Sequence, residues 1–519
     1  MPARPAPRPR HLFGPYVVFV GALLLWTAPG HLRFPDEEIV FQTTESLARR
    51  GSLAIEGIPK RTGEPKGRPA GTFGWAPGTD GRRYGFFGHG LSLAALPAYL
   101  AGVAAARVLG PAASHLPRSD HYVFHRRGHQ ADLTRLSASL TNVAVTALLG
   151  WTSAALFAAC GAGWAAACGA SLLAIFGTVL WAYAGTFLSE PLSALCLVTG
   201  AHAAVRMHTA RDDRSQTRWA ALSALAVGAS VHVHVLNLVA VPCFVAYAWL
   251  GGPRPLGRRA ALVSHLLGAA LLALVGLDHY LRFGDPFETG RYGHYSHFTW
   301  PWPAAVAFVA APGRSVFLFA PALTVGLLGI RRALRRARGP MWLALAVLAT
   351  RWAFVSCRSD WWGGWSYGPR YLVPAFPLLG LPLAFLLERL GTLRRPFRRA
   401  VVVALSVSVL LSASLALFSP FEHMHALLVR DAPGPPSYLD RSHWAPAASP
   451  YVNVWTLSHV DVLPLGALRL WRAGHPGPAI VLGAVAALGL GALFVLVARL
   501  RRLAHGERGE HPARHGDAC

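Results

Sequence analysis

The 519-residue sequence predicts an all-α polytopic membrane protein with about 12–14 membrane segments. Two compositional observations predict this fold class: 53% of the residues are hydrophobic, and only 14% are charged. The third observation is that arginine is largely confined to short loops between long apolar runs. This distribution is typical of cytoplasmic loops, so the net charge of +25 indicates membrane topology and no nucleic-acid partner.

The amino-terminal region predicts a tail, a first span and an external loop. Residues 1–11 are rich in proline and arginine, which is typical of a disordered cytoplasmic tail. Residues 12–28 resemble the apolar part of a signal peptide but lack a clear A-x-A cleavage site. We therefore expect an uncleaved first transmembrane helix. Residues 30–84 then form the first external loop.

An amphipathic surface helix is predicted at the start of that loop. Three carboxylates, Asp36, Glu37 and Glu38, follow a proline, apolar residues recur at helical spacing, and Gly51 is a plausible helix stop. Such a helix would lie on the membrane surface, where its acids would meet the headgroup of a lipid-linked substrate. A second explanation stays open, because acids in a first turn and arginines in a last turn also suit the helix dipole.

The next part of the chain is interpreted from its basic loops. Residues 85–109 read as a second span, and the basic loop 118–135 then lies in the cytoplasm. The next cytoplasmic marker, 206–218, follows three apolar blocks, although a return to the same side needs an even number of crossings. We therefore expect the middle block, 162–184, to bend into two half-helices. Glu190 would then begin the following span on the external side.

The remaining segments alternate between the two sides. The apolar run 220–250 lies between cytoplasmic arginines and predicts a hairpin of two short helices, with the polar stretch 232–237 near its outer apex. The expected regions after it are external loops 282–313 and 357–370, a small external segment 419–474, a last transmembrane helix 475–500 and a basic tail 501–519.

Polar and aromatic residues gather on the predicted external face, which indicates an active site there. Each candidate has an alternative explanation: His89 between glycines as a turn residue, Glu190 as a helix start, and Arg370 as an interfacial anchor. His294 and His297 could hold a metal, and Trp361 could belong to an aromatic interface belt or stack on a sugar. The substrate- or phosphate-binding candidates are His89, Arg291, His294, His297, Trp361, Tyr367 and Arg370.

Several of these residues carry a resemblance to a known family. Asp36-Glu37 follows the first span, Glu190 lies in Leu-Ser-Glu-Pro-Leu, and Arg370 lies in Gly-Pro-Arg-Tyr-Leu-Val-Pro. With the broken hairpin, this pattern over residues 12–418 resembles the GT-C superfamily of polyprenyl-phosphate-sugar-dependent membrane glycosyltransferases. The likeness is to the branch of protein mannosyltransferases and aminoarabinose transferases. It implies a GT-C-like transmembrane catalytic module.

The resemblance also implies roles for residues. Asp36 would be the catalytic base, with Glu37 as the alternative, Glu190 the second acid, and Arg370 the group that holds the lipid phosphate. Two features depart from the family. Gly88-His89-Gly90 stands where aminoarabinose transferases have Lys-Pro-Pro, and 419–474 is too short for a large external β-domain.

The expected function is inverting transfer of a sugar from a polyprenyl-phosphate donor to a lipid, glycan or protein acceptor. The expected partners are that donor and membrane lipids, no cofactor is certain, and a divalent metal stays open. The expected location is the inner (plasma) membrane, with the active site facing the periplasm or exterior. The alternative is a transporter or flippase for a lipid-linked or small polar substrate. Its two-sided path and paired repeats are not evident in the sequence.

Overall fold

The computed structural model describes residues 10–56, 74–109, 129–291, 296–430, 437–457, 460–472 and 474–509, and it is predominantly helical. The predicted all-α membrane class is confirmed, since six helical segments of the described residues are long and apolar enough to cross a membrane. These segments are Leu133–Ala159, Arg258–Phe283, Arg338–Ser356, Arg370–Thr392, Arg395–Leu417 and Gly477–Leu503. Four shorter apolar helices accompany them: His11–Thr27, Leu96–Val108, Trp164–Phe176 and Val235–Leu250.

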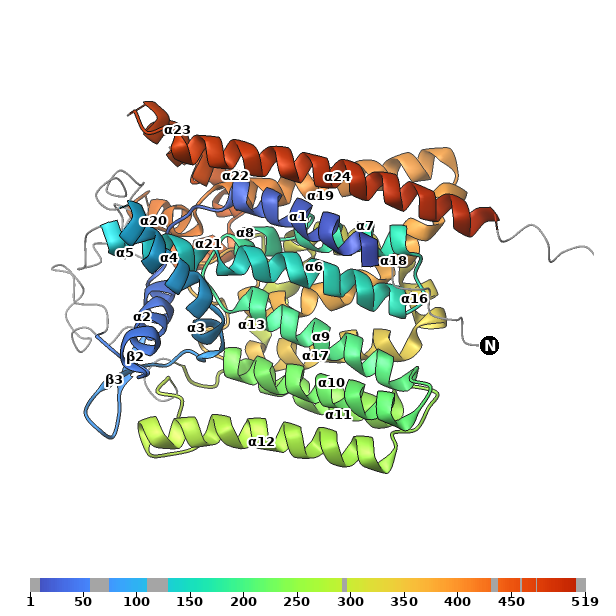
Figure 1. Ribbon diagram of the computed structural model, residues 1–519, viewed down its shortest axis with the longest axis horizontal. Helices are drawn as coiled ribbons and strands as arrows, with labels where there is room; N and C mark the ends of the chain where they lie inside the picture. Colours follow the sequence, from blue (N-terminus) through green and yellow to red (C-terminus); the bar gives the residue numbers. More distant parts are fainter. Residues whose placement is uncertain are drawn as a thin grey trace, which may run out of the picture.

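Most helices lie lengthwise between two ends of one bundle (Figure 1). α1 (Arg10–Thr27) packs between α24 (Gly477–Gly509) and α6 (Thr141–Ala159), and α10 (Asp213–Val233) packs between α9 (Glu190–His208) and α12 (Arg258–Phe283). The later helices are α13 (Trp302–Ala310), α16 (Ile330–Arg336), α17 (Arg338–Ser356), α18 (Leu381–Arg389), α19 (Arg395–Leu417), α20 (Pro420–Arg430), α21 (Tyr438–Trp444), α22 (Pro450–Asn453) and α23 (Leu463–Arg472).

The helix predicted after the first span is present as α2 (Pro35–Arg50). It begins at the proline and ends at Gly51, whose φ of 60° lies in the left-handed region that glycine adopts without strain. A small antiparallel sheet of order β1 (Ala54–Ile55), β3 (Arg83–Gly85), β2 (Trp75–Pro77), which the sequence analysis did not predict, lies beside α2. A side chain at Gly85 would meet Ile39 at 2.8 Å, so glycine lets the sheet approach the helix.

The structure contradicts the prediction that 85–109 is a second span and that the following loop lies at the opposite end from α2. The described residues of 85–109 and 129–139 form α3 (Gly90–Ala94), α4 (Leu96–Leu109) and α5 (His129–Ser139), which lie at the same end as α2 (Figure 1). Arg135 pairs with Glu38 of α2 at 2.8 Å, and Arg49 donates to the Tyr99 hydroxyl at 2.9 Å. The charge of Arg135 therefore serves an ion pair and does not mark the cytoplasmic side. The 14 residues of α4 are also too short for a bilayer core of about 30 Å.

The middle apolar block is broken, as predicted, into α7 (Trp164–Phe176) and α8 (Leu180–Ala184). The break was predicted so that the number of membrane crossings would be even. That argument was wrong, because α7 and α8 together still run from one end of the bundle to the other. The loop before α7 lies at the far end, where Glu388 accepts from the Gly163 amide, while Glu190 begins α9 near α2. The break exchanges backbone hydrogen bonds with a second break, between α14 (Val316–Phe319) and α15 (Pro321–Gly326).

The predicted apex between two helices is also present. α10 ends at Val233, and a 3-10 segment, η2 (Val235–Ala240), leads into α11 (Val241–Leu250). The buried Arg351 of α17 donates to the Asn237 side chain at 2.5 Å and to the Tyr371 carbonyl at 2.9 Å. It thereby joins η2 to η4 (Arg370–Gly380), a 3-10 segment with two internal prolines. The irregular backbone at η2 and η4 interrupts the regular helical hydrogen bonds, and side chains donate to carbonyl groups at and near these segments. Arg351 donates to the Tyr371 carbonyl, and Asn237 donates to the Ser230 carbonyl.

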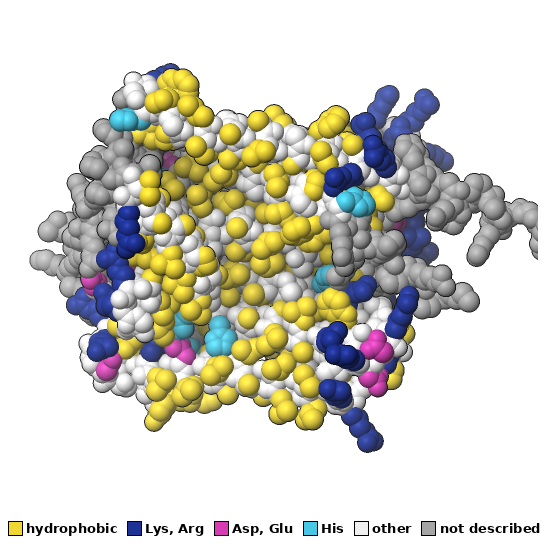
Figure 2. Space-filling model, viewed as in Figure 1, with side chains coloured by type: hydrophobic (Ala, Val, Ile, Leu, Met, Phe, Trp, Pro, Cys, Tyr) yellow, Lys and Arg dark blue, Asp and Glu magenta, His cyan; other side chains and the backbone are white. Residues whose placement is uncertain are grey.

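Basic side chains gather at the end of the bundle opposite α2 (Figure 2). At that end, Arg332 and Arg336 both pair with Glu388, at 3.5 and 3.1 Å. Apolar side chains cover much of the surface between the two ends in the same view.

Candidate active site

Arg370 contacts two acids, Asp36 and Glu190, that the family resemblance singled out together with it. Its Nε donates to Oε1 of Glu190 at 2.6 Å, and its Nη1 donates to Oδ2 of Asp36 at 2.9 Å. The carboxylates come from the starts of α9 and α2, so three elements distant in sequence meet at one guanidinium. The Asp36 side chain is 20% exposed and that of Glu190 only 3%. Asp36 is therefore the carboxylate of this pair that a substrate can reach.

The loop before Arg370 is shaped to hold this side chain. The Gly363 carbonyl accepts a hydrogen bond from Nη1 at 3.1 Å. Gly363 has a φ of 77°, and a Cβ there would lie 2.7 Å from the Arg370 side chain. Buried Arg314 donates to the carbonyls of Ser366 and Gly368 at 2.8 and 3.0 Å. Because Gly363 has no side chain and tolerates a positive φ, the backbone can approach the Arg370 side chain closely at this point.

Glu37 lies beside Asp36 but is fully occupied by backbone amides. Its Oε1 accepts from the Phe187 amide at 2.7 Å, and its Oε2 accepts from the amides of Arg33 and Phe34. Burial raises the pKa of Glu37 to about 7, although these three hydrogen bonds act in the opposite direction. The residue thus connects the loop before α2 to the turn before α9, which is a positioning role. Asp36, in contrast, keeps a partly exposed side chain.

A second cluster of charges lies next to Arg370, around Tyr371. Arg291 donates to Asp360 at 2.6 Å and to the Tyr371 hydroxyl at 2.9 Å, and Arg358 donates to both oxygens of Asp360 at 2.8 and 2.9 Å. Burial opposes the charge of Asp360, yet the two arginines hold its pKa well below the usual range. Burial also opposes the charge of Arg291, while Tyr371, Asp360 and Asp36 raise its pKa. The Asp36 carboxylate thus acts on a guanidinium of the second cluster.

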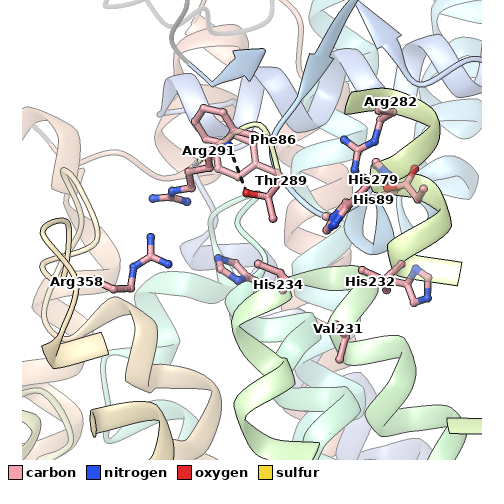
Figure 3. A pocket seen from close by; sticks show the side chains of 15 residues that line it. Phe86, His89, Val231, His232, His234, His279, Arg282, Thr289, Arg291 and Arg358 are labelled. Carbon is pink, nitrogen blue, oxygen red and sulfur yellow. Dashed lines mark hydrogen bonds and ion pairs between the residues drawn. The ribbon is translucent and has the colours of Figure 1, made fainter. Parts of the chain in front are cut away.

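A pocket opens beside this second cluster (Figure 3). Arg291 and Arg358 line one side, with His234 next to them, and His89, His279 and Arg282 line the other. His89 lies 2.8 Å from Asp278 of α12, which also pairs with Arg282. The charged side chains of the lining are three arginines and Asp278, so positive charge exceeds negative charge there, which suits an anionic group.

The predicted residue His89 lies in this pocket because its neighbours are glycines. A Cβ at Gly88 would lie 2.3 Å from the His232 carbonyl oxygen, and one at Gly90 would lie 2.5 Å from Val233. The Gly-His-Gly turn can therefore press against the end of α10 while His89 reaches Asp278.

Other predicted residues lie outside the two charge clusters. Trp361 packs against Phe308 and His443, with ring centroids 5.5 and 4.9 Å apart. Tyr367 is buried, and its ring lies 5.8 Å from His423. His297 is exposed, with its backbone bonded to Ser359, and His294 lies outside the described residues. Within the described part of the chain, no three or more His, Cys, Asp or Glu side chains gather as a metal site.

Sequence reasoning did not single out Arg358 or Asp360. Acids are few in this chain, with 24 in 519 residues, so each one in a predicted external loop was a signal. Asp360, between Arg358 and the tryptophans, carried that signal.

A further missed residue, Asp461, holds the loop that leads into α2. It accepts from Arg33 Nε at 2.8 Å and lies 2.8 Å from His31 Nε2. Two residues later, the Leu463 amide donates to the Ala28 carbonyl at 2.7 Å. The carboxy-terminal part of the chain therefore helps to position Asp36.

Comparison with known proteins gives limited similarity. No family model matches the sequence, and no curated protein matches it. Similar solved structures include ArnT from Cupriavidus metallidurans in the apo state and the same protein bound to undecaprenyl phosphate. Each is 16% identical in sequence, the matches cover 95% of this chain and 76% of ArnT, and the TM-scores are 0.46 and 0.47. The roles of individual residues therefore follow from the geometry of this chain.

Proposed function

We propose that this chain transfers a sugar from a polyprenyl-phosphate donor to an acceptor hydroxyl at the α2 end of the bundle, with inversion at the anomeric carbon. One observation carries the proposal: two adjacent clusters have opposite charge imbalance. Arg370 is shared by Asp36 and Glu190, which leaves one surplus negative charge. Asp360 is shared by Arg291 and Arg358, which leaves one surplus positive charge.

This polarity fits the reaction. The acceptor oxygen attacks the anomeric carbon as its proton passes to a base, and the bond from that carbon to the phosphate oxygen breaks. Negative charge then grows on the departing polyprenyl phosphate. A base is needed at the negative cluster, and fixed cations are needed at the positive one. Asp36, with Oδ2 held by Arg370, is the accessible carboxylate for the first task.

The phosphate would bind at Arg291, Arg358 and Tyr371. Arg291 donates to the Tyr371 hydroxyl oxygen, so the hydroxyl proton can be donated to a phosphate. In this arrangement Arg370 acts mainly on Asp36, which differs from the family analogy that gave Arg370 the phosphate. The two planar guanidiniums would also donate hydrogen bonds to the phosphate as its negative charge grows.

The orientation in the membrane belongs to the same proposal. Basic residues at the end opposite α2 fit the positive-inside rule, so the site would face the periplasm or exterior of an inner membrane. A transporter would need ionisable groups along a path through the membrane, whereas both clusters lie near the α2 end.

The test is a transfer assay in nanodiscs with a panel of polyprenyl-phosphate monosaccharide donors and of lipid, glycan and protein acceptors, which measures release of polyprenyl phosphate. Asp36→Asn keeps the size of the side chain and removes its basicity. It should lower the rate by roughly 10²–10⁴-fold while donor binding persists. Glu388→Gln, which removes a carboxylate at the opposite end, is the matched control and should keep the rate. Wild-type turnover in Asp36→Asn would refute the assigned base, and no release from any donor would refute the function.

A further inference from the structure

An apolar crevice lies between α11 and α12, on one face of α10, in the half of the bundle away from α2. Its floor consists of small or β-branched residues at helical spacing. These residues are Ala220, Ser223, Ala224, Val227 and Gly228 of α10. Eight residues of helix span about 12 Å, which is close to the thickness of one leaflet of the hydrocarbon core, about 15 Å. The crevice floor is thus slightly shorter than one leaflet is deep.

The walls of the crevice are mainly apolar, with Ser264 and His265 as their polar members, and leave space between them. Phe244 and Ala248 come from α11, and Gly268 and Leu272 come from α12. A Cβ at Gly268 would meet no atom within 4 Å, so the protein does not fill the crevice at that point. None of the described residues that line it is Asp, Glu, Lys or Arg. A hydrocarbon chain is the ligand that such a lining accepts.

A polar contact and a set of arginines mark the mouth of the crevice. Trp249 of α11 donates to His265 of α12 at 3.4 Å and connects the two walls. Arg218 near the start of α10, and Arg258 and Arg259 at the start of α12, are exposed at this end. The nearby Asp213 pairs with Arg254 at 2.6 Å, and Asp212 caps α10. The exposed guanidiniums suit a lipid phosphate.

We propose that this crevice binds an acyl chain of an anionic glycerophospholipid, whose phosphate contacts Arg218, Arg258 and Arg259. The site lies in the opposite half of the bundle from Arg370 and does not depend on the proposed transfer reaction. A bound lipid would hold α12 against α10 and α11. Asp278 and Arg282, which line the pocket shown in Figure 3, lie at the other end of α12, so the lipid would also stabilise the position of that helix there.

The experiment compares lipids retained by the full-length protein after transfer from nanodiscs of mixed phosphatidylglycerol and phosphatidylcholine, measured by native mass spectrometry. Gly268→Leu fills the crevice with a residue of higher helix propensity, and Ala269→Leu is a second filling variant. Gly483→Leu is the matched control, because Gly483 of α24 also faces open space. Thermal midpoints in detergent without added lipid check the folding of every variant.

The wild type and Gly483→Leu should retain phosphatidylglycerol in preference to phosphatidylcholine, and the two filling variants should lose it. The double variant Arg258→Gln/Arg259→Gln should weaken retention of phosphatidylglycerol by about fivefold for each charge removed. Undiminished retention in both folded filling variants would overturn the site. Equal retention of the two lipids by the wild type would overturn the assignment to an anionic headgroup.

Discussion

Arg370 donates a 2.9 Å hydrogen bond to Asp36, a residue 334 positions earlier in the chain. The same guanidinium binds the buried Glu190, so the position of an accessible carboxylate depends on a buried ion pair. The two carboxylates therefore differ in what they can contact. Asp36 is accessible to a substrate, whereas the buried Glu190 holds Arg370 in position.

Substitution of Arg370 should impair both stability and transfer. Arg370→Ala leaves Glu190 buried without its cation, which costs roughly 3–5 kcal/mol of unfolding free energy. Arg370→Lys keeps the charge, but one ammonium group cannot reproduce the two-sided contact, so its loss should be smaller. Thermal midpoints and transfer rates measure the two effects. If Arg370→Ala is as stable and as active as the wild type, Arg370 is only an interfacial anchor.

Substitution of Arg291 or Arg358 should weaken binding of the lipid phosphate. Each guanidinium is expected to donate a charge-assisted hydrogen bond to the phosphate, and loss of one should raise the Kd for polyprenyl phosphate by about tenfold or more. Arg332→Gln, which removes a partner of Glu388 at the far end, is the control. Binding to protein in nanodiscs can be followed by native mass spectrometry. Unchanged affinity in both Arg291→Gln and Arg358→Gln would place the phosphate elsewhere.

Glu37 should make stability depend on pH. Its pKa is about 7 in the folded chain and near 4.5 when unfolded, so the folded state binds the proton more tightly. Its stabilising contribution is full below about pH 4.5 and is lost as the pH rises through about 7, by at most about 3 kcal/mol. Thermal midpoints of wild type and Glu37→Gln should therefore diverge across this window. Parallel pH profiles for the two proteins would contradict the shift.

Asp461 should affect turnover through the loop that leads into α2. Asp461→Asn weakens the contacts with His31 and Arg33, so Asp36 should be held less firmly. We expect kcat to fall by roughly tenfold or more with little change in KM for the donor, because misplacement of a reacting group acts mainly on turnover. Asp461→Glu should restore part of the rate. Glu388→Gln removes a carboxylate that also pairs with two arginines, and equal loss of kcat in both variants would indicate general destabilisation.

The sequence by itself determined the membrane class and the local course of α2. Composition predicts burial in lipid, and a proline, three acids and a glycine define a helix through local chemistry that needs no distant partner. A break within 162–184 and another near 232–237 were also expected, although the count of membrane crossings behind the first was wrong. The loop that contains Arg135 was wrongly placed in the cytoplasm, because an arginine that pairs with Glu38 looks the same in sequence as one that faces the cytoplasm.

Only the tertiary structure decided which charges belong together. Asp36, Glu190 and Arg370 could each be named from the sequence, but their shared contact joins residues hundreds of positions apart and leaves no local pattern. The sequence also could not show that Glu37 is buried among backbone amides while Asp36 is partly exposed, because this difference depends on the folded surroundings of each carboxylate. Desolvation and ion pairing act through the folded surroundings, so these roles become defined only when α2, α9 and η4 meet.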